Sequence, residues 1–165
     1  MKHLFLILVV ISLSGFGQTA EDYFNKGLAK CELQDYTGAI SDFNNAIQLK
    51  PDYAVAYSNR GTAKYYLQDY RGAITDYNKY IQLKPDDADA YYSRGNTKFN
   101  LQDYTEAIND YNKAIQLKPD YARFYNNRGS AKYYLKDLIG ACKDWRKAGE
   151  LGDSDAYTTI KDFCK

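Results

Sequence analysis

The chain of 165 residues is long enough for one domain or one array of repeats. Its 22 Lys and Arg are balanced by 21 Asp and Glu, and the resulting net charge of +1 provides no basic surface for nucleic acid or acidic lipid. The one histidine is His3, so the rest of the chain lacks the commonest acid–base group and metal ligand.

Residues 1–17 have the pattern of a secretory signal peptide. A basic start at Lys2 precedes an apolar run over residues 4–13, and Gly15 and Gly17 supply small residues at −3 and −1 of a cleavage site. A retained membrane anchor is the alternative, but the apolar run is far shorter than the roughly 20 residues that a membrane span needs. We expect cleavage after Gly17, no membrane insertion of the mature chain, and export to the periplasm or out of the cell.

From residue 20 the sequence repeats with a period of 34 residues. The residues of the segment Ala54–Asp87 that recur 34 positions later include Tyr57, Arg60, Gly61, Lys64, Leu67, Asp69, Tyr70, Ala73, Ile74, Asp76, Tyr77, Asn78 and Pro85. A period of this length indicates stacked units that cannot bury their apolar faces alone. We divide the array, residues 20–155, into units 20–53, 54–87, 88–121 and 122–155.

Each unit is expected to contain two antiparallel helices. In the second unit, a first helix over Ala54–Leu67 turns at Gln68 and Asp69 into a second helix over Arg71–Leu83. Pro85 then ends the second helix, because proline cannot continue the hydrogen-bond ladder.

The fourth unit departs from the pattern in its second helix. Leu138, Cys142 and Trp145 replace the recurring tyrosine, isoleucine and Tyr or Phe, and an amphipathic helix over Ala156–Phe163 follows. Residues 156–165 are therefore predicted to form a C-terminal cap that covers the open end of the stack.

Two of the three cysteines are candidates for a disulfide. Cys142 and Cys164 lie on opposite arms of a predicted helical hairpin that turns near Gly152 and Asp153, so antiparallel arms bring them to nearly the same height. In an exported protein this geometry favours a disulfide, and two buried thiols are the alternative. Cys31 would remain unpaired, and three cysteines without histidine do not indicate a zinc site.

The unit resembles the tetratricopeptide repeat, a helix–turn–helix of 34 residues. The family's signature aromatic, glycine, second-helix alanine, second aromatic and closing proline are matched by Tyr57, Gly61, Ala73, Tyr77 and Pro85. The resemblance implies an all-α fold, an α-solenoid of stacked helix–turn–helix repeats forming a right-handed superhelix. Within each unit, the small residues at facing positions should let the two helices approach closely.

Charged residues replace two apolar positions of the family pattern. Arginine stands where leucine is usual, at Arg60, Arg94 and Arg128, and lysine where tyrosine is frequent, at Lys30, Lys64, Lys98 and Lys132. The arginines recur together with Asp76, Asp110 and Asp144. We expect a ladder of Arg–Asp pairs within or between units, because a partly buried arginine needs a carboxylate partner. A row of anion-binding arginines is the alternative.

In the resembled family, the first helices line a concave groove that usually binds the partner. The corresponding residues here are Ser58, Thr62, Tyr65, Tyr92, Asn96, Phe99, Asn126, Ser130 and Tyr133, after Phe24, Leu28 and Cys31 in the first unit. Asparagine amides suit the backbone of an extended peptide and tyrosines pack on its side chains, whereas an ordinary solvated groove is the alternative. The lysines with which a subset of the family grips a C-terminal carboxylate are missing here.

The sequence contains no nucleophile–base pair, metal cluster or glycine-rich phosphate loop, so we expect neither catalysis nor a cofactor. The leading hypothesis is a non-catalytic protein–protein interaction module that binds a peptide segment of a partner in its groove. The alternative is a structural scaffold or oligomer subunit of an envelope complex that acts through its convex surface or array ends. A third hypothesis is a glycan binder that uses exposed tyrosines as stacking platforms.

Overall fold

The computed structural model describes residues 17–164, and within this range every regular element is an α-helix. The helices are α1 (Ala20–Glu32), α2 (Tyr36–Leu49), α3 (Ala54–Tyr66), α4 (Tyr70–Leu83), α5 (Ala88–Asn100), α6 (Tyr104–Leu117), α7 (Ala122–Tyr134), α8 (Leu138–Glu150) and α9 (Ser154–Phe163). The predicted all-α fold is confirmed. The predicted signal peptide lies outside the described residues, apart from Gly17.

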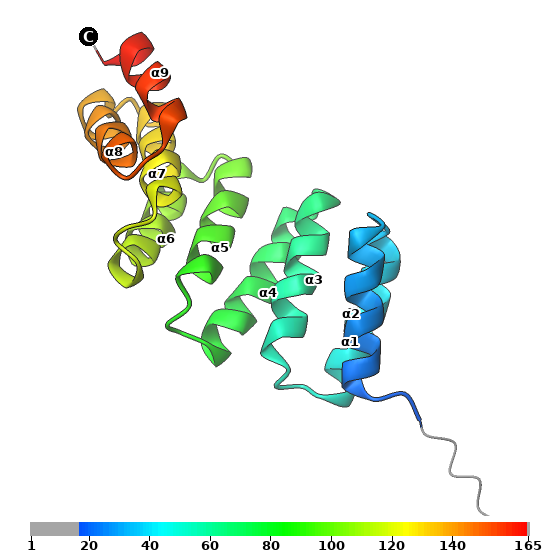
Figure 1. Cartoon of the computed structure of the whole chain (residues 1–165). Coiled ribbons are helices and arrows are strands. Elements are labelled where there is room, and N and C mark those ends of the chain that lie inside the picture. Colours follow the sequence, from blue (N-terminus) through cyan, green and yellow to red (C-terminus); the bar gives the residue numbers. More distant parts are fainter. Residues whose placement is uncertain (1–16, 165) are drawn as a thin grey trace, which may run out of the picture.

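The helices form a solenoid in which each packs mainly on the helices next to it in sequence. They follow one another along the molecule, from α1 at one end to α9 at the other (Figure 1). The first helices of successive units also touch, α1 with α3, α3 with α5 and α5 with α7. In residues 17–164, none of the helices combines the length and the apolar character that crossing a membrane requires.

The turn inside each unit uses a left-handed residue followed by an aspartate. In the second unit, Gln68 has a φ of 62°, which ends α3. The side chain of Asp69 then accepts a hydrogen bond from the backbone N–H of Gly72 and caps α4. As a result α4 begins at Tyr70, one residue before the predicted start.

The two helices of a unit approach closely where the sequence predicted it. A Cβ atom added to Gly61 would lie 3.3 Å from the carbonyl oxygen of Ala73, and one added to Gly95 would lie 2.8 Å from Cε1 of Tyr111. Only glycine allows the second-helix ring to lie this close to the first helix. The predicted close approach is confirmed.

The predicted ladder of Arg–Asp pairs is confirmed, and a lysine joins each pair. Arg94 donates from Nε and Nη2 to the carboxylate of Asp110, at 2.9 and 2.6 Å, and Lys98 Nζ lies 2.9 Å from the same carboxylate. The third nitrogen of Arg94, Nη1, donates to Asn78 of the preceding unit at 2.6 Å. The equivalent residues are Arg60, Asp76, Lys64 and Asn44, and then Arg128, Asp144, Lys132 and Asn112. The Arg–Asp pairs thus lie within units, and the Arg–Asn bonds link each unit to the one before it.

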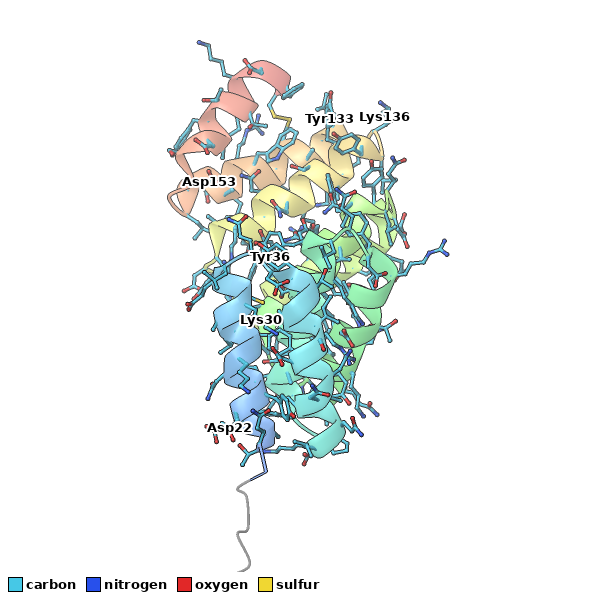
Figure 2. The ribbon with its side chains drawn as sticks, turned by 90° about the vertical axis from the view of Figure 1, so that its right-hand side faces the viewer. Asp22, Lys30, Tyr36, Tyr133, Lys136 and Asp153 are labelled. Carbon is cyan, nitrogen blue, oxygen red and sulfur yellow. A yellow bond between two sulfur atoms is a disulfide. The ribbon has the colours of Figure 1, made fainter. Side chains whose placement is uncertain are left out.

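The C-terminal cap begins earlier than the predicted boundary at residue 156. Gly152 has a φ of 97°, and the carboxylate of Asp153 accepts hydrogen bonds from the backbone N–H groups of Asp155 and Ala156, so α9 starts at Ser154. The structure joins Cys142 of α8 to Cys164, with their Cα atoms 5.7 Å apart. This disulfide is the yellow bond beside α9 in Figure 2.

Candidate peptide-binding groove

Two adjoining hollows lie along the first helices of units two to four. One, of about 240 Å³, is lined by Tyr65, Asn96, Phe99, Asn100, Tyr111, Asn127 and Ser130. The other, of about 270 Å³, is lined by Thr62, Tyr65, Tyr66, Tyr77, Ser93 and Asn96. Because Tyr65 and Asn96 belong to both hollows, we treat them as one feature and call it the central groove. Its lining residues are aromatic, amide or hydroxyl side chains, and none is charged.

Tyrosines of the second helices form part of the floor of the central groove. The ring of Tyr111 on α6 is almost fully buried, and its hydroxyl donates to Oδ1 of Asn96 at 2.8 Å. Tyr77 on α4 makes the equivalent contact in the unit before, where its hydroxyl lies 3.1 Å from Oγ1 of Thr62. Burial raises the pKa of both tyrosines above the ordinary value, so both hydroxyls keep their protons at neutral pH.

An asparagine pair lies at the centre of the groove. Nδ2 of Asn127 donates to Oδ1 of Asn96 at 2.8 Å and to the hydroxyl of Tyr92 at 3.0 Å. Oδ1 of Asn96 therefore accepts from both Asn127 and Tyr111, which fixes the orientation of the two amides. Among residues 17–164, no group bonds Nδ2 of Asn96 or Oδ1 of Asn127. The pair thus presents one unused donor group, the NH2 of Asn96, and one unused acceptor, Oδ1 of Asn127.

A further bond ties two units together along the groove. Nδ2 of Asn100 on α5 donates to the hydroxyl of Tyr65 on α3 at 2.9 Å. The side chain of Tyr65 also packs edge-on against Tyr66 and Tyr70. The ring of Tyr65 is therefore fixed in place as a wall of the groove.

The structure brings together five of the nine groove residues proposed from the sequence. The five that line the central groove are Thr62, Tyr65, Asn96, Phe99 and Ser130. The other four, Ser58, Tyr92, Asn126 and Tyr133, are not among its lining residues. Asn126 donates to Asp153 at 2.6 Å, beside the cap, and Tyr133 packs on Trp145 and Phe163 under it. Tyr92 packs between Tyr111 and Phe124 and supports the asparagine pair from behind.

Sequence reasoning missed six lining residues, namely Tyr66, Tyr77, Ser93, Asn100, Tyr111 and Asn127. Ser93, Asn100 and Asn127 each follow a predicted position by one residue. The face of each first helix that lines the groove is therefore rotated slightly from the predicted face. Tyr77 and Tyr111 belong to the second helices. The signal that could have identified them is the length of the tyrosine side chain, which extends past the glycine of the facing first helix into the groove.

The side chains available at the groove are polar and aromatic. Within residues 17–164, no group of three or more His, Cys, Asp or Glu side chains is placed to hold a metal ion. The acidic side chains of the ladder are already bound by arginine and lysine. What the groove can provide is hydrogen bonding and aromatic packing.

Comparison with known proteins agrees with this architecture. The family model described as TPR repeat matches residues 27–67, 61–102 and 95–136, which together cover most of the described chain. The chain belongs to the TPR repeat family. A search of curated proteins gave no match.

Several solved structures are similar to this chain. The crystal structure of MamA has 26% sequence identity and a TM-score of 0.81, and the match covers 88% of this chain and 85% of MamA. MamA 41-end from Desulfovibrio magneticus RS-1 has 25% identity and a TM-score of 0.78, covering 82% of this chain and 78% of that one. The first TPR of Spaghetti (RPAP3) bound to the HSP90 peptide SRMEEVD has 27% identity and a TM-score of 0.69, covering 72% and 94%.

Proposed function

We propose that this TPR protein is a non-catalytic binding module that holds an extended, uncharged peptide segment of a protein partner in the central groove. One observation carries the proposal: the asparagine pair presents an oriented donor and an oriented acceptor in a groove without charged lining residues. A peptide group offers the complementary carbonyl and N–H.

The walls of the groove support the same ligand class. Tyr65 and Phe99 are partly exposed aromatic side chains held by neighbouring rings, and such rings pack on peptide side chains with little loss of conformational entropy. The similar RPAP3 domain is described as bound to a peptide, which shows that a related array can hold one. That peptide is acidic, whereas the groove here has no lining cation to pair with a carboxylate. We therefore infer an internal, uncharged segment rather than an acidic tail.

Selection from a displayed peptide library tests the proposal. The wild-type protein should enrich peptides with a central uncharged stretch, and the double variant Asn96→Ala/Asn127→Ala should bind them at least tenfold more weakly, because two hydrogen bonds of about 1 kcal/mol each are lost. Asn109→Ala is the matched control, since Asn109 is exposed on α6 and bonds only Glu106. Equal binding by the double variant, or enrichment of acidic C-terminal peptides, would contradict the proposal.

We also propose that the mature protein works outside the cytoplasm. The signal pattern of residues 1–17 supports this, and a disulfide such as Cys142–Cys164 persists in oxidising compartments. The mass of protein recovered from the cell envelope or the medium should correspond to a chain that begins at Gln18. Recovery only from the cytoplasm, with residues 1–17 intact, would contradict export.

A further inference from the structure

The C-terminal end of the solenoid exposes an apolar hollow beside the disulfide. The hollow has a volume of about 210 Å³ and is lined by Leu138, Ile139, Cys142, Arg146, Phe163 and Cys164. Ile139 is 87% exposed, and Leu138 and Phe163 are nearly half exposed. We call this feature the C-terminal hollow.

The hollow exists because α9 is too short to cover α8 completely. At the position of Leu138, earlier units have Tyr36 and Tyr104, which stack on Tyr66 and Tyr134 of the following unit at 4.8 and 4.9 Å between ring centroids. Helix α9 has 10 residues where α3 has 13, and its last residue, Phe163, lines the hollow together with Leu138. Ile139 stands where the other units have Thr37, Arg71 and Thr105, so this surface position is apolar only in unit four.

Arg146 lines this hollow, and a second basic side chain lies near it on the same helix. Arg146 occupies the position of the ladder residues Asn44, Asn78 and Asn112, and Lys143 is one turn before it on α8. Both are exposed, and neither forms an ion pair with any residue in the range 17–164. The hollow therefore suits an apolar side chain that is accompanied by a carboxylate.

The opposite end of the molecule carries such a side chain. Leu33 at the end of α1 is 81% exposed, whereas the equivalent Leu67, Leu101 and Leu135 are 41–46% exposed. Glu32 precedes Leu33 and Asp35 follows it closely, and both acidic residues are exposed without an ion pair in the described part of the chain. An apolar anchor flanked by carboxylates thus lies at the start of the array.

The first unit and the C-terminal part of the chain also carry opposite net side-chain charges. Residues 20–53 contain three Lys and six Asp or Glu, a side-chain charge of −3. Residues 122–165 contain nine Lys or Arg and six Asp or Glu, a charge of +3. The two middle units are neutral, with nine of each sign. Such a distribution orients two copies so that the first end of one meets the last end of the other.

We propose that this protein associates head to tail with a second copy of itself, with Leu33 of one copy in the C-terminal hollow of the other and Glu32 opposite Arg146 and Lys143. The contact joins two different surfaces, so it does not close into a symmetric dimer and can be repeated along a chain of copies. It leaves the central groove open, because neither surface includes a groove residue. Self-association is therefore independent of peptide binding.

The mass of the mature protein in solution, measured by light scattering over a range of concentrations, tests the proposal. We expect the mass to rise with concentration at low salt and to fall when salt is raised to about 0.5 M, where the screening length is only a few ångström. Arg146→Glu and Glu32→Arg should each weaken self-association at least tenfold, since each places like charges across the contact. Ile139→Thr, which gives the residue of units one and three, should also weaken it, and Thr105→Ala is the control at the same position of unit three, away from both ends.

Mixing the two charge variants distinguishes this arrangement from others. In a mixture of Arg146→Glu and Glu32→Arg chains, each head meets a tail of opposite charge, so association should return to near the wild-type level. A protein that remains monomeric at all concentrations overturns the proposal. So does association that survives both charge variants, or that is not restored by mixing, because either result requires a symmetric contact or a different partner surface.

Discussion

The three ladder aspartates are buried charges that the fold has to neutralise. The side chains of Asp76, Asp110 and Asp144 are at most 5% exposed, and each receives two nitrogens of an arginine and one of a lysine. The arginine also lies over the ring of the tyrosine three residues earlier, as Arg94 does over Tyr91 at 5.5 Å. These arginines therefore serve the structure, and the anion-binding alternative is not needed to explain them.

Asp110→Ala should lower the free energy of unfolding by about 3–5 kcal/mol, because Arg94 and Lys98 would remain partly buried without their carboxylate. Asp120→Ala is the control, since Asp120 is exposed in a turn and its loss should change stability by less than about 0.5 kcal/mol. Urea denaturation of the two variants measures the difference. Equal stability would show that the ladder contributes nothing net.

Tyr80 and Asp87 form a paired departure from the repeat. The position of Tyr80 is alanine in the other units, at Ala46, Ala114 and Ala148, whereas Asp87 replaces the tyrosines of the two equivalent boundaries, Tyr53 and Tyr121. The Tyr80 hydroxyl donates to Asp87 at 2.6 Å. A tyrosine ring is thus kept at this boundary, but it comes from Tyr80 on α4 and not from the residue that precedes the next helix.

Burial and the bond to Asp87 raise the pKa of Tyr80 to about 12, from an ordinary value near 10. Between these values the unfolded chain loses a proton that the folded chain keeps, so the contribution of Tyr80 to stability is complete below about pH 10 and is lost as the pH rises to about 12. Tyr80→Phe should be less stable than wild type at neutral pH by about 1 kcal/mol. The difference should shrink above pH 10 in denaturation curves recorded across this range, and a constant difference would contradict the assignment.

At the scale of single elements, the sequence predicted the helices well and their ends to within one or two residues. Gln68 and Asp69 indicated a turn, but the earlier start of α4 depends on which residue accepts the capping bond, and periodicity does not reveal this. The early start of α9 has the same cause at Asp153. The groove was harder to predict, because a small rotation of each first helix decides whether Tyr92 or Ser93 faces it.

Helix α9 depends on its covalent tie to α8. It is short, and Phe163 and Tyr157 are about half exposed on its surface. In Cys142→Ser/Cys164→Ser, the loop of 22 residues between the cysteines is no longer closed, which should destabilise the α9 region by about 2–4 kcal/mol. Trypsin should then cut at Lys161 at least tenfold faster, with Cys31→Ser as the control. An unchanged rate of cleavage would show that packing alone holds the cap.

For the whole molecule, the 34-residue period predicted stacked units, and the resemblance of Tyr57, Gly61 and Pro85 to the repeat pattern of the family predicted the all-α solenoid. The asparagine pair was not predictable in this way. It depends on Asn96, Asn127 and the buried hydroxyl of Tyr111, which come from three helices in two units. The C-terminal hollow also escaped sequence reasoning, since it results from the length of α9 rather than from any motif.

Because the Cys142–Cys164 disulfide lies at the α9 end, the solenoid should unfold in a preferred direction. Each unit packs on its neighbours, so the first unit is supported on one side only, whereas the fourth unit is covered by α9 on its outer side. The disulfide reinforces the α9 end, whereas α1 at the other end packs on α2 and α3 without a covalent tie. Under tension or mild warming, the array should therefore unfold from α1 inward, and α8 and α9 should be the last helices to unfold.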